Sequence, residues 1–208
     1  AGYAIQAPVI ESEKINADLN CRLLIKAECL QRTGSFKFRG AFNMISRLSE
    51  KQKEKGVVAF SSGNHAQGVA TAAKIFGIKA TIIMPDDAPQ IKIDNTISAG
   101  AKIIFYKRSN GDRKKIALNI VNKTEATLIP PFDATDIMAG QGTVGVEFIK
   151  QTKKIGVELD HLLCPCSGGG LVGGTAIAYK EQSPQTLIYS VEPEGYDDTA
   201  LSLKAGRR

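Results

Sequence analysis

The chain has 208 residues, of which 43% are hydrophobic and 23% charged, with a net charge of +6. These values suit one globular domain or two small ones and exclude a chain that is disordered by composition. No apolar run approaches the roughly 18 residues of a membrane span and no signal peptide is evident, so we expect a soluble, cytoplasmic protein without membrane partners. The basic runs lack interleaved aromatic residues, which argues against nucleic-acid binding.

Short β-rich apolar runs alternate with segments of helical length along the chain. We expect strands at residues 23–26, 57–60, 80–84, 102–106, 127–129, 161–164 and 187–191. Such alternation is typical of βα units on a parallel sheet, so an α/β fold is predicted. The cysteines at positions 21, 29, 164 and 166 lack the CxxC spacing of a zinc or redox site and are predicted to be free, buried thiols in a reducing compartment.

Lys37 is the first candidate catalytic residue along the chain, and it lies in a helix predicted over residues 36–48. At roughly 100° per residue, it shares a face with Phe38, Ala41, Phe42, Met44, Ile45 and Leu48. The opposite face is predicted to be polar and contains Arg39, Gly40, Asn43, Ser46 and Arg47. Burial and the helix dipole both lower the pKa of a lysine here, and a partly neutral amine is a nucleophile and a general base. A lysine whose stem crosses apolar surface to reach water is the alternative.

The second notable segment is Ser61-Ser-Gly-Asn-His-Ala-Gln-Gly68, which follows a predicted strand and opens a helix. Backbone donors at such a turn bind anions, and the hydroxyl, amide and imidazole groups add further hydrogen bonds. An N-cap formed by Ser62 or Asn64 would explain only one of these side chains. We therefore expect a site for a carboxylate and a phenolic oxygen.

The third segment is Ser167-Gly-Gly-Gly-Leu-Val-Gly-Gly174, between a predicted strand and a helix. A glycine run at a helix N-terminus lets backbone amides close around a phosphate. The segment also matches GxGxxG, and Glu192 lies 19 residues beyond Gly173, so an NAD-binding oxidoreductase is an alternative. That alternative leaves Lys37 and the Asn64 turn unexplained.

A buried lysine, a carboxylate-binding turn and a phosphate-binding turn together describe a pyridoxal phosphate site. The segments at 34–41, 62–67, 131–133 with 139–143, and 167–171 resemble those of the threonine dehydratase and serine racemase group of fold type II pyridoxal phosphate enzymes. The resemblance extends from about Pro8 to Arg208. It implies helices on both faces of the sheet, a large domain (residues 1–55 and 134–208) and a small α/β domain (56–133). It also implies a C-terminally truncated chain, because the residue that faces the pyridine nitrogen comes from a later segment.

The resemblance assigns roles to individual residues. Lys37 forms the Schiff-base link, Phe36 packs against the pyridine ring and Asn64 bonds the phenolic oxygen. The phosphate is held by Ser167, Gly168, Gly169, Gly170 and Leu171, with Ser167 at a position where the family often has glycine. The substrate carboxylate is bound by Ser61, Ser62, Asn64, His65 and Ala66.

The implied activity is the conversion of L-threonine or L-serine to a 2-oxo acid and ammonia, with Lys37 as the base that removes the α-proton. Phe132 favours this dehydratase interpretation. Ser62 stands where many threonine dehydratases carry alanine, so a serine racemase or a threo-3-hydroxyaspartate ammonia-lyase is the alternative, with Ser62 protonating the opposite face. A regulatory module that binds the cofactor without turnover is a third class.

Two further expectations come from the resemblance. The acidic loop at 192–198 is similar to a divalent-metal loop, in which Glu192, Tyr196 and Asp198 would bind Mg²⁺, Mn²⁺ or Ca²⁺ through oxygen atoms. A solvated acidic turn would explain the same residues. The full-length protein is expected to be a homo-oligomer, either a dimer or a tetramer.

Overall fold

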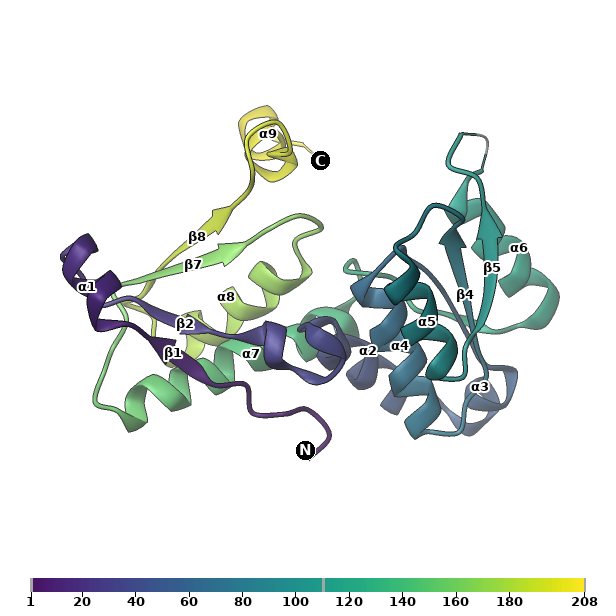
Figure 1. Ribbon diagram of the computed structural model, residues 1–208, viewed down its shortest axis with the longest axis horizontal. Helices are drawn as coiled ribbons and strands as arrows, with labels where there is room; N and C mark the ends of the chain where they lie inside the picture. The colour runs from purple at the N-terminus through teal and green to yellow at the C-terminus, as the bar shows by residue number, and fades with distance from the viewer. Residues whose placement is uncertain (1, 110, 208) are drawn as a thin grey trace.

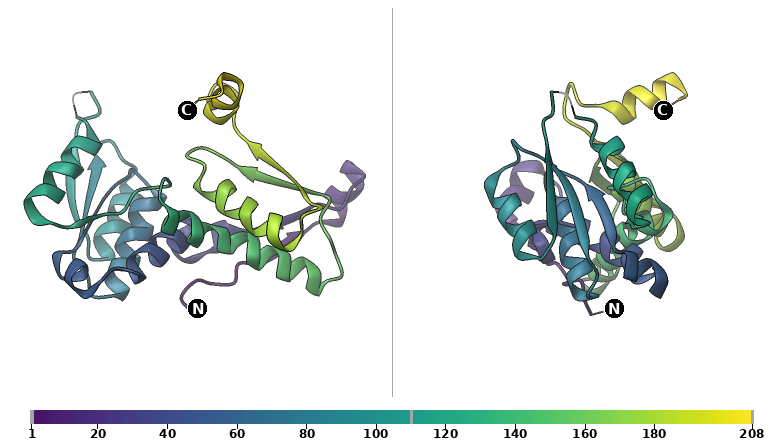
Figure 2. Two further views of the ribbon diagram at one scale, coloured as in Figure 1. Left: turned by 180° about the vertical axis from the view of Figure 1, so that it is seen from behind. Right: turned by 90° about the vertical axis from the view of Figure 1, so that its right-hand side faces the viewer.

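The computed structural model describes residues 2–109 and 111–207, so the predictions that include Ala1, Asn110 or Arg208 extend outside the described residues. Figure 1 shows two lobes that meet near α2 (Lys37–Ser46) and α4 (Asn64–Ile75). The C-terminal helix α9 (Asp198–Ala205) projects away from both lobes (Figures 1 and 2). Within the described residues, no helix has both the length and the apolar character needed to cross a membrane.

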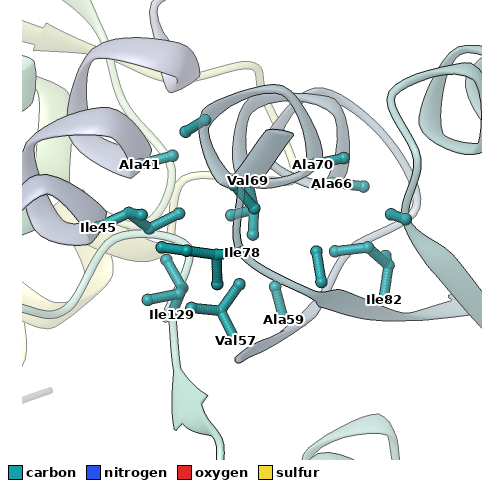
Figure 3. Packing of buried hydrophobic residues seen from close by; sticks show 14 of the residues in the cluster. Ala41, Ile45, Val57, Ala59, Ala66, Val69, Ala70, Ile78, Ile82 and Ile129 are labelled. Carbon is teal, nitrogen blue, oxygen red and sulfur yellow. The ribbon is translucent and has the colours of Figure 1, made fainter. Parts of the chain in front are cut away.

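The first lobe is built on a four-stranded sheet in the order β5-β4-β3-β6, and all of its pairings are parallel. Its elements are α3 (Glu50–Lys55), β3 (Val57–Phe60), α4, β4 (Ala80–Pro85), α5 (Gln90–Ser98), β5 (Lys102–Tyr106), α6 (Arg113–Thr124) and β6 (Thr127–Leu128). Successive strand residues point to opposite faces. Val57 and Ala59 accordingly pack in the core shared with α4 (Figure 3), whereas Val58 packs with Ala117 of α6. The expected parallel sheet with helices on both faces is confirmed.

The second lobe contains two small sheets, an antiparallel β1-β2 pair and a parallel β7-β8 pair. Its elements are β1 (Val9–Glu11), α1 (Glu13–Leu19), β2 (Leu24–Lys26), the 3₁₀ turns η1 (Glu28–Leu30) and η2 (Arg32–Gly34), α7 (Thr135–Lys154), β7 (His161–Pro165), α8 (Gly170–Gln182), β8 (Leu187–Val191) and α9. Phe148 of α7, Leu162 of β7 and Tyr179 of α8 form its buried cluster. The antiparallel strand β1 was not predicted. The prediction that the cysteines are buried is wrong for Cys21 and Cys29, which are exposed, and correct for Cys164 and Cys166.

Helix α2 packs on two sides. Phe38 and Ile45 lie in the core of the first lobe, as the apolar pattern predicts, although α2 precedes residue 56. The predicted polar face is wrong for Arg39 and Gly40, which are buried against the neighbouring elements. The division into domains at residues 55/56 and 133/134 stays a prediction.

Opposing carboxylates explain how the Arg39 charge is accommodated inside the protein. Its guanidinium bonds both carboxylate oxygens of Glu28, at 2.7 and 2.8 Å, and both of Glu147, at 3.1 Å. Lys26 also pairs with Glu147. Because a buried charge is tolerated only when it is paired and hydrogen-bonded, this cluster fixes α2 to η1 and α7.

Helices α2, α7 and α8 form a stack in which small residues allow very close approach, and α7 and α8 lie side by side in Figure 2. A Cβ atom on Gly140 would lie 2.5 Å from the Cα of Gly40. A Cβ atom on Gly174 would lie 2.2 Å from the carbonyl oxygen of Met138. We call α2, α7 and α8 the three-helix stack, and it joins the start of α2 to the start of α8.

Candidate active site

A cavity of about 440 Å³ lies between the lobes, at the carboxyl ends of strands β3 and β7. In α/β sheets, ligands bind in this position. The cavity is lined by Phe36, Lys37, Phe60, Ser61, Ser62, Gly63, Asn64, His65, Arg113, Pro131, Phe132, Pro165, Cys166, Ser167, Gly168, Gly169, Gly170, Leu171 and Val172. The three segments singled out in the sequence therefore meet in one cavity, although more than 100 residues separate the first from the last.

Lys37 is the first residue of α2 and is half-buried beside the cavity. Its Nζ donates a hydrogen bond of 2.7 Å to the carbonyl oxygen of Pro131 and lies 5.3 Å from the ring centre of Phe36. Burial lowers the pKa of Lys37 from 10.5 to about 8. Roughly one lysine in ten at this position is then neutral at pH 7, which meets the requirement for a nucleophile or a base.

The second segment forms the turn between β3 and α4. Gly63 is the N-cap residue of α4, and no side chain caps this helix, so the N-cap explanation for Ser62 and Asn64 is wrong. The Ser61 hydroxyl instead accepts a hydrogen bond of 3.1 Å from the Gly63 N–H. The first backbone N–H groups of α4 have no partner within the helix. They are therefore donors for a carboxylate at the cavity wall.

His65 is fully buried next to this turn. Its Nε2 lies 2.9 Å from the carbonyl oxygen of Ile129, and its Nδ1 has no hydrogen-bond partner among the described residues. Burial lowers the pKa of His65 to about 4, and the nearby positive charge of Lys37 adds to the effect. The imidazole is thus neutral at pH 7, with its proton on Nε2, which donates it to the Ile129 carbonyl.

The third segment forms the turn between β7 and α8. Its glycines are required for different structural reasons. Gly169 is the N-cap residue of α8 and adopts a left-handed conformation with φ of 81°. A Cβ atom on Gly168 would lie 2.2 Å from the ring of Phe132. Glycine therefore lets the backbone of this turn approach Phe132, and the uncapped N-terminus of α8 presents amide donors for a phosphate.

The residues around the cavity fit pyridoxal phosphate. Lys37 offers an amine, the α8 N-terminus offers phosphate donors, and Phe36 and Phe132 supply apolar surface for a ring. Asn64 adds an amide at the first position of α4.

Four of the predicted site residues lie outside the cavity lining. Ala66 is fully buried, and its side chain packs in the core of the first lobe (Figure 3), so it can contribute only its backbone N–H. Glu192 accepts hydrogen bonds of 3.0 to 3.1 Å from the backbone N–H groups of Thr199 and Ala200, at the start of α9. Tyr196 is 77% exposed. Asp198, predicted to complete the metal site, is an exposed residue at the start of α9. No group of three or more histidine, cysteine, aspartate or glutamate side chains suited to a metal occurs in the described residues.

Arg113 lines the cavity but was not predicted. It is the first residue of α6, and its guanidinium lies 5.6 Å from the ring centre of Phe60. Within residues 2–109 and 111–207 it forms no ion pair. An unpaired guanidinium at the wall of a cavity is suited to a carboxylate.

Comparison with known proteins decides the family. The model of the family described as pyridoxal-phosphate dependent enzyme matches residues 2–208. The chain belongs to this family. An L-threo-3-hydroxyaspartate ammonia-lyase of Pseudomonas sp is 46% identical over 205 residues, which cover 99% of this chain and 63% of the relative. A serine racemase of Arabidopsis thaliana is 42% identical over 205 residues, which cover 99% and 61%.

Solved structures of the family share the fold. A threonine deaminase of T.th. superposes with a TM-score of 0.92 at 43% identity, covering 99% of this chain and 65% of that one. The match confirms the predicted fold type II architecture. The chain spans less than two thirds of the length of each of these three relatives.

Proposed function

We propose that this pyridoxal-phosphate dependent enzyme is an ammonia-lyase that acts on β-hydroxy amino acids, converting L-threonine to 2-oxobutyrate and L-serine to pyruvate, each with release of ammonia. The observation that carries the proposal is the meeting of Lys37, the Ser61–His65 turn and the Ser167–Leu171 turn in one cavity. The names of the relatives support the same reaction class, since a threonine deaminase is 43% identical.

In this proposal the chain's own groups bind and orient the substrate. Backbone donors of the α4 N-terminus, with Ser61 and Ser62, bind the substrate carboxylate. The bound cofactor supplies an electron sink for charge that develops at the α-carbon. The Nζ of Lys37, with a pKa of about 8, accepts the α-proton near neutral pH. Phe36 and Phe132 exclude water from the ring face.

Racemisation of serine is the first alternative, and Ser62 is the residue that favours it. Its side chain lines the cavity on the β3–α4 turn, whereas Lys37 approaches from α2. A hydroxyl on the other face of the planar carbanion would return the proton there and yield the D-amino acid. Replacement of Ser62 by alanine should then abolish D-serine formation and leave 2-oxo acid formation in place.

Elimination from L-threo-3-hydroxyaspartate is the second alternative, and Arg113 favours it. This substrate carries a second carboxylate, and the Arg113 guanidinium is a matching cation at the cavity wall. The 46% identity to an ammonia-lyase named for this substrate supports the same choice. The relative rates with L-threonine, L-serine and L-threo-3-hydroxyaspartate distinguish the candidates.

Divalent metal binding, the cytoplasmic location and the homo-oligomer remain predictions. The acidic loop does not converge on an ion, because Glu192 is engaged by backbone N–H groups of α9. No catalytic step is therefore assigned to a metal. Calorimetric titration with Mg²⁺, with Glu192→Gln as the control, tests whether the loop rearranges to bind one.

Chemical trapping tests the central assignment. Borohydride reduction of the yellow protein, followed by peptide mapping, should place a pyridoxyl group on Lys37. Production of a 2-oxo acid from each hydroxy amino acid should be abolished by Lys37→Ala. Binding of NAD by a protein whose Lys37 stays unmodified would support the oxidoreductase alternative instead, and cofactor binding without turnover would support a regulatory module.

A further inference from the structure

Lys92 touches the active site through one residue only. It lies in the first turn of α5, and its Nζ donates a hydrogen bond of 2.7 Å to Oδ1 of Asn64. Asn64 lines the cavity, whereas Lys92 does not. Lys92 can therefore affect a ligand in the cavity either through the Asn64 carboxamide or through the positive charge of its own ammonium group.

A second bridge holds α5 in register with α4. One turn further along both helices, Nδ2 of Asn95 donates a hydrogen bond of 3.0 Å to Oε1 of Gln67. Lys92 and Asn95 are three residues apart, as are Asn64 and Gln67, so the two bridges are parallel. The Lys92 carbonyl also accepts a hydrogen bond from the fully buried Thr96. These hydrogen bonds hold the helix backbone at Lys92 in register with α4.

Helix stability does not explain a lysine at this position. Lys92 lies near the N-termini of both α5 and α4, where the helix dipoles disfavour a positive charge. In the part of the chain that the structure describes, it forms no ion pair with a carboxylate. Although Lys92 also lines a second cavity beside Lys74, the hydrogen bond to Asn64 is the one polar contact of its ammonium group among the described residues.

The chemistry of the two groups fixes the orientation of the amide. An ammonium group has three donors and no acceptor, so only the carbonyl oxygen of Asn64 can face Lys92. The Asn64 NH₂ group is then directed elsewhere as a donor. A hydrogen bond from a cation also polarises the amide, which makes its N–H groups stronger donors.

We infer that Lys92 is a positioning residue that holds the Asn64 NH₂ group toward the cavity for the phenolic oxygen of pyridoxal phosphate. The inference rests on the proposed function for the identity of the ligand. Without Lys92, the Asn64 amide is free to rotate and present either its donor or its acceptor, and an acceptor would repel an anionic oxygen.

The test compares cofactor binding by matched variants of the whole chain. Lys92→Met keeps the stem and removes the donor, and Lys92→Arg keeps a donor-only cation. Lys74→Met is the control, because Nζ of Lys74 also bridges α4 and α5 through a hydrogen bond of 3.1 Å to the Ser98 carbonyl. Equilibrium dialysis of the cofactor-free proteins against pyridoxal phosphate should show affinity about tenfold weaker for Lys92→Met. Lys92→Arg should recover most of this loss, and Lys74→Met should match the wild type.

Two further readouts separate positioning from a structural role. The pH midpoint of the visible absorption change should move upward in Lys92→Met, because the anionic phenolic oxygen loses stabilisation. In an Asn64→Ala background, Lys92→Met should cause no additional loss of affinity, since residues that act as a unit are not additive. This cycle remains informative if Lys92→Met alone is less stable.

The outcomes distinguish this inference from the proposed function. A wild-type chain that fails to bind pyridoxal phosphate overturns both. If the wild type binds pyridoxal phosphate and Lys92→Met binds it with the same affinity, only the positioning role is overturned. The same holds if Lys92→Met and Lys74→Met lose equal affinity. An additional loss in the Asn64→Ala background also overturns it, because Lys92 would then act by another route.

Discussion

Replacement of Lys37 by methionine should stabilise the cofactor-free protein while it abolishes activity. Burial lowers the pKa of Lys37 from 10.5 to about 8, and each unit of pKa corresponds to about 1.4 kcal/mol. The folded state therefore carries a penalty of about 3 kcal/mol at pH 7, where the lysine must be charged in a partly desolvated position. Methionine keeps the apolar stem and removes the charge.

The pH dependence isolates this penalty from other effects of the substitution. The unfolded chain binds more protons than the folded one between pH 8 and 10.5, so the stability of the wild type rises with pH in this window. The penalty falls from about 3 kcal/mol at pH 7 to about 1 kcal/mol at pH 9.5. Constant terms, such as loss of the hydrogen bond to Pro131, cancel in this difference.

The assay is urea unfolding of both proteins at pH 7 and pH 9.5, after removal of the cofactor and in the presence of a thiol reductant. The stability advantage of Lys37→Met should shrink by about 2 kcal/mol between the two pH values. An advantage that does not change with pH would refute the reasoning, because it would mean that Lys37 titrates alike in the folded and unfolded states.

Three further predictions concern other parts of the molecule. Gly174→Ala should lower the free energy of unfolding by more than about 2 kcal/mol, because the new Cβ would meet the Met138 carbonyl at 2.2 Å. Gly173→Ala should be nearly neutral in the same urea titration, because its new Cβ would make only an ordinary contact with Sδ of Met138 at 4.0 Å. Glu147→Gln should cost about 3 kcal/mol at pH 7. Burial raises the pKa of Glu147, but hydrogen bonds from its cationic partners outweigh burial and leave the pKa lowered below its ordinary value of 4.5. The wild type should therefore lose this contribution as the pH falls below 4.5 toward the lowered pKa, and the variant should not. Arg113→Leu should reduce kcat/KM for L-threo-3-hydroxyaspartate at least about tenfold more than for L-threonine, and equal reductions would exclude the guanidinium as a carboxylate ligand.

Local sequence patterns predicted most of the fold, because strands and helices in this chain have clear apolar periodicity. Each of the seven predicted strands occurs, with its ends within one residue of the expected positions. Strand β1 was missed because it has only three residues, of which Val9 is half-buried and the other two are exposed. Its structure depends on pairing with β2 rather than on its own pattern.

Errors at the site have a common physical cause, which is contact between distant segments. The helical projection treated α2 as a helix with one buried side, but α7 buries the other side. The two carboxylates that neutralise Arg39 lie 11 and 108 residues away. Arg113 opens one of the basic runs of the sequence, and nothing local distinguishes it from the lysines that follow. By contrast, Lys37 and the two turns could be recognised as candidate site segments from the sequence, because the functional groups of each lie within a few consecutive residues.

The three-helix stack has a consequence for engineering. The stack joins the amine of Lys37 at one end to the glycine turn at the other, so the spacing between these anchors is set by backbone contacts such as those of Gly140 and Gly174. Ser62 and Arg113, which we propose face the substrate, lie on the other lobe. Libraries that vary Ser62 or Arg113 should therefore retain cofactor loading, provided that Asn64 and Lys92 on the same lobe are kept. Random mutations in the buried glycines would impair loading from positions that no ligand touches.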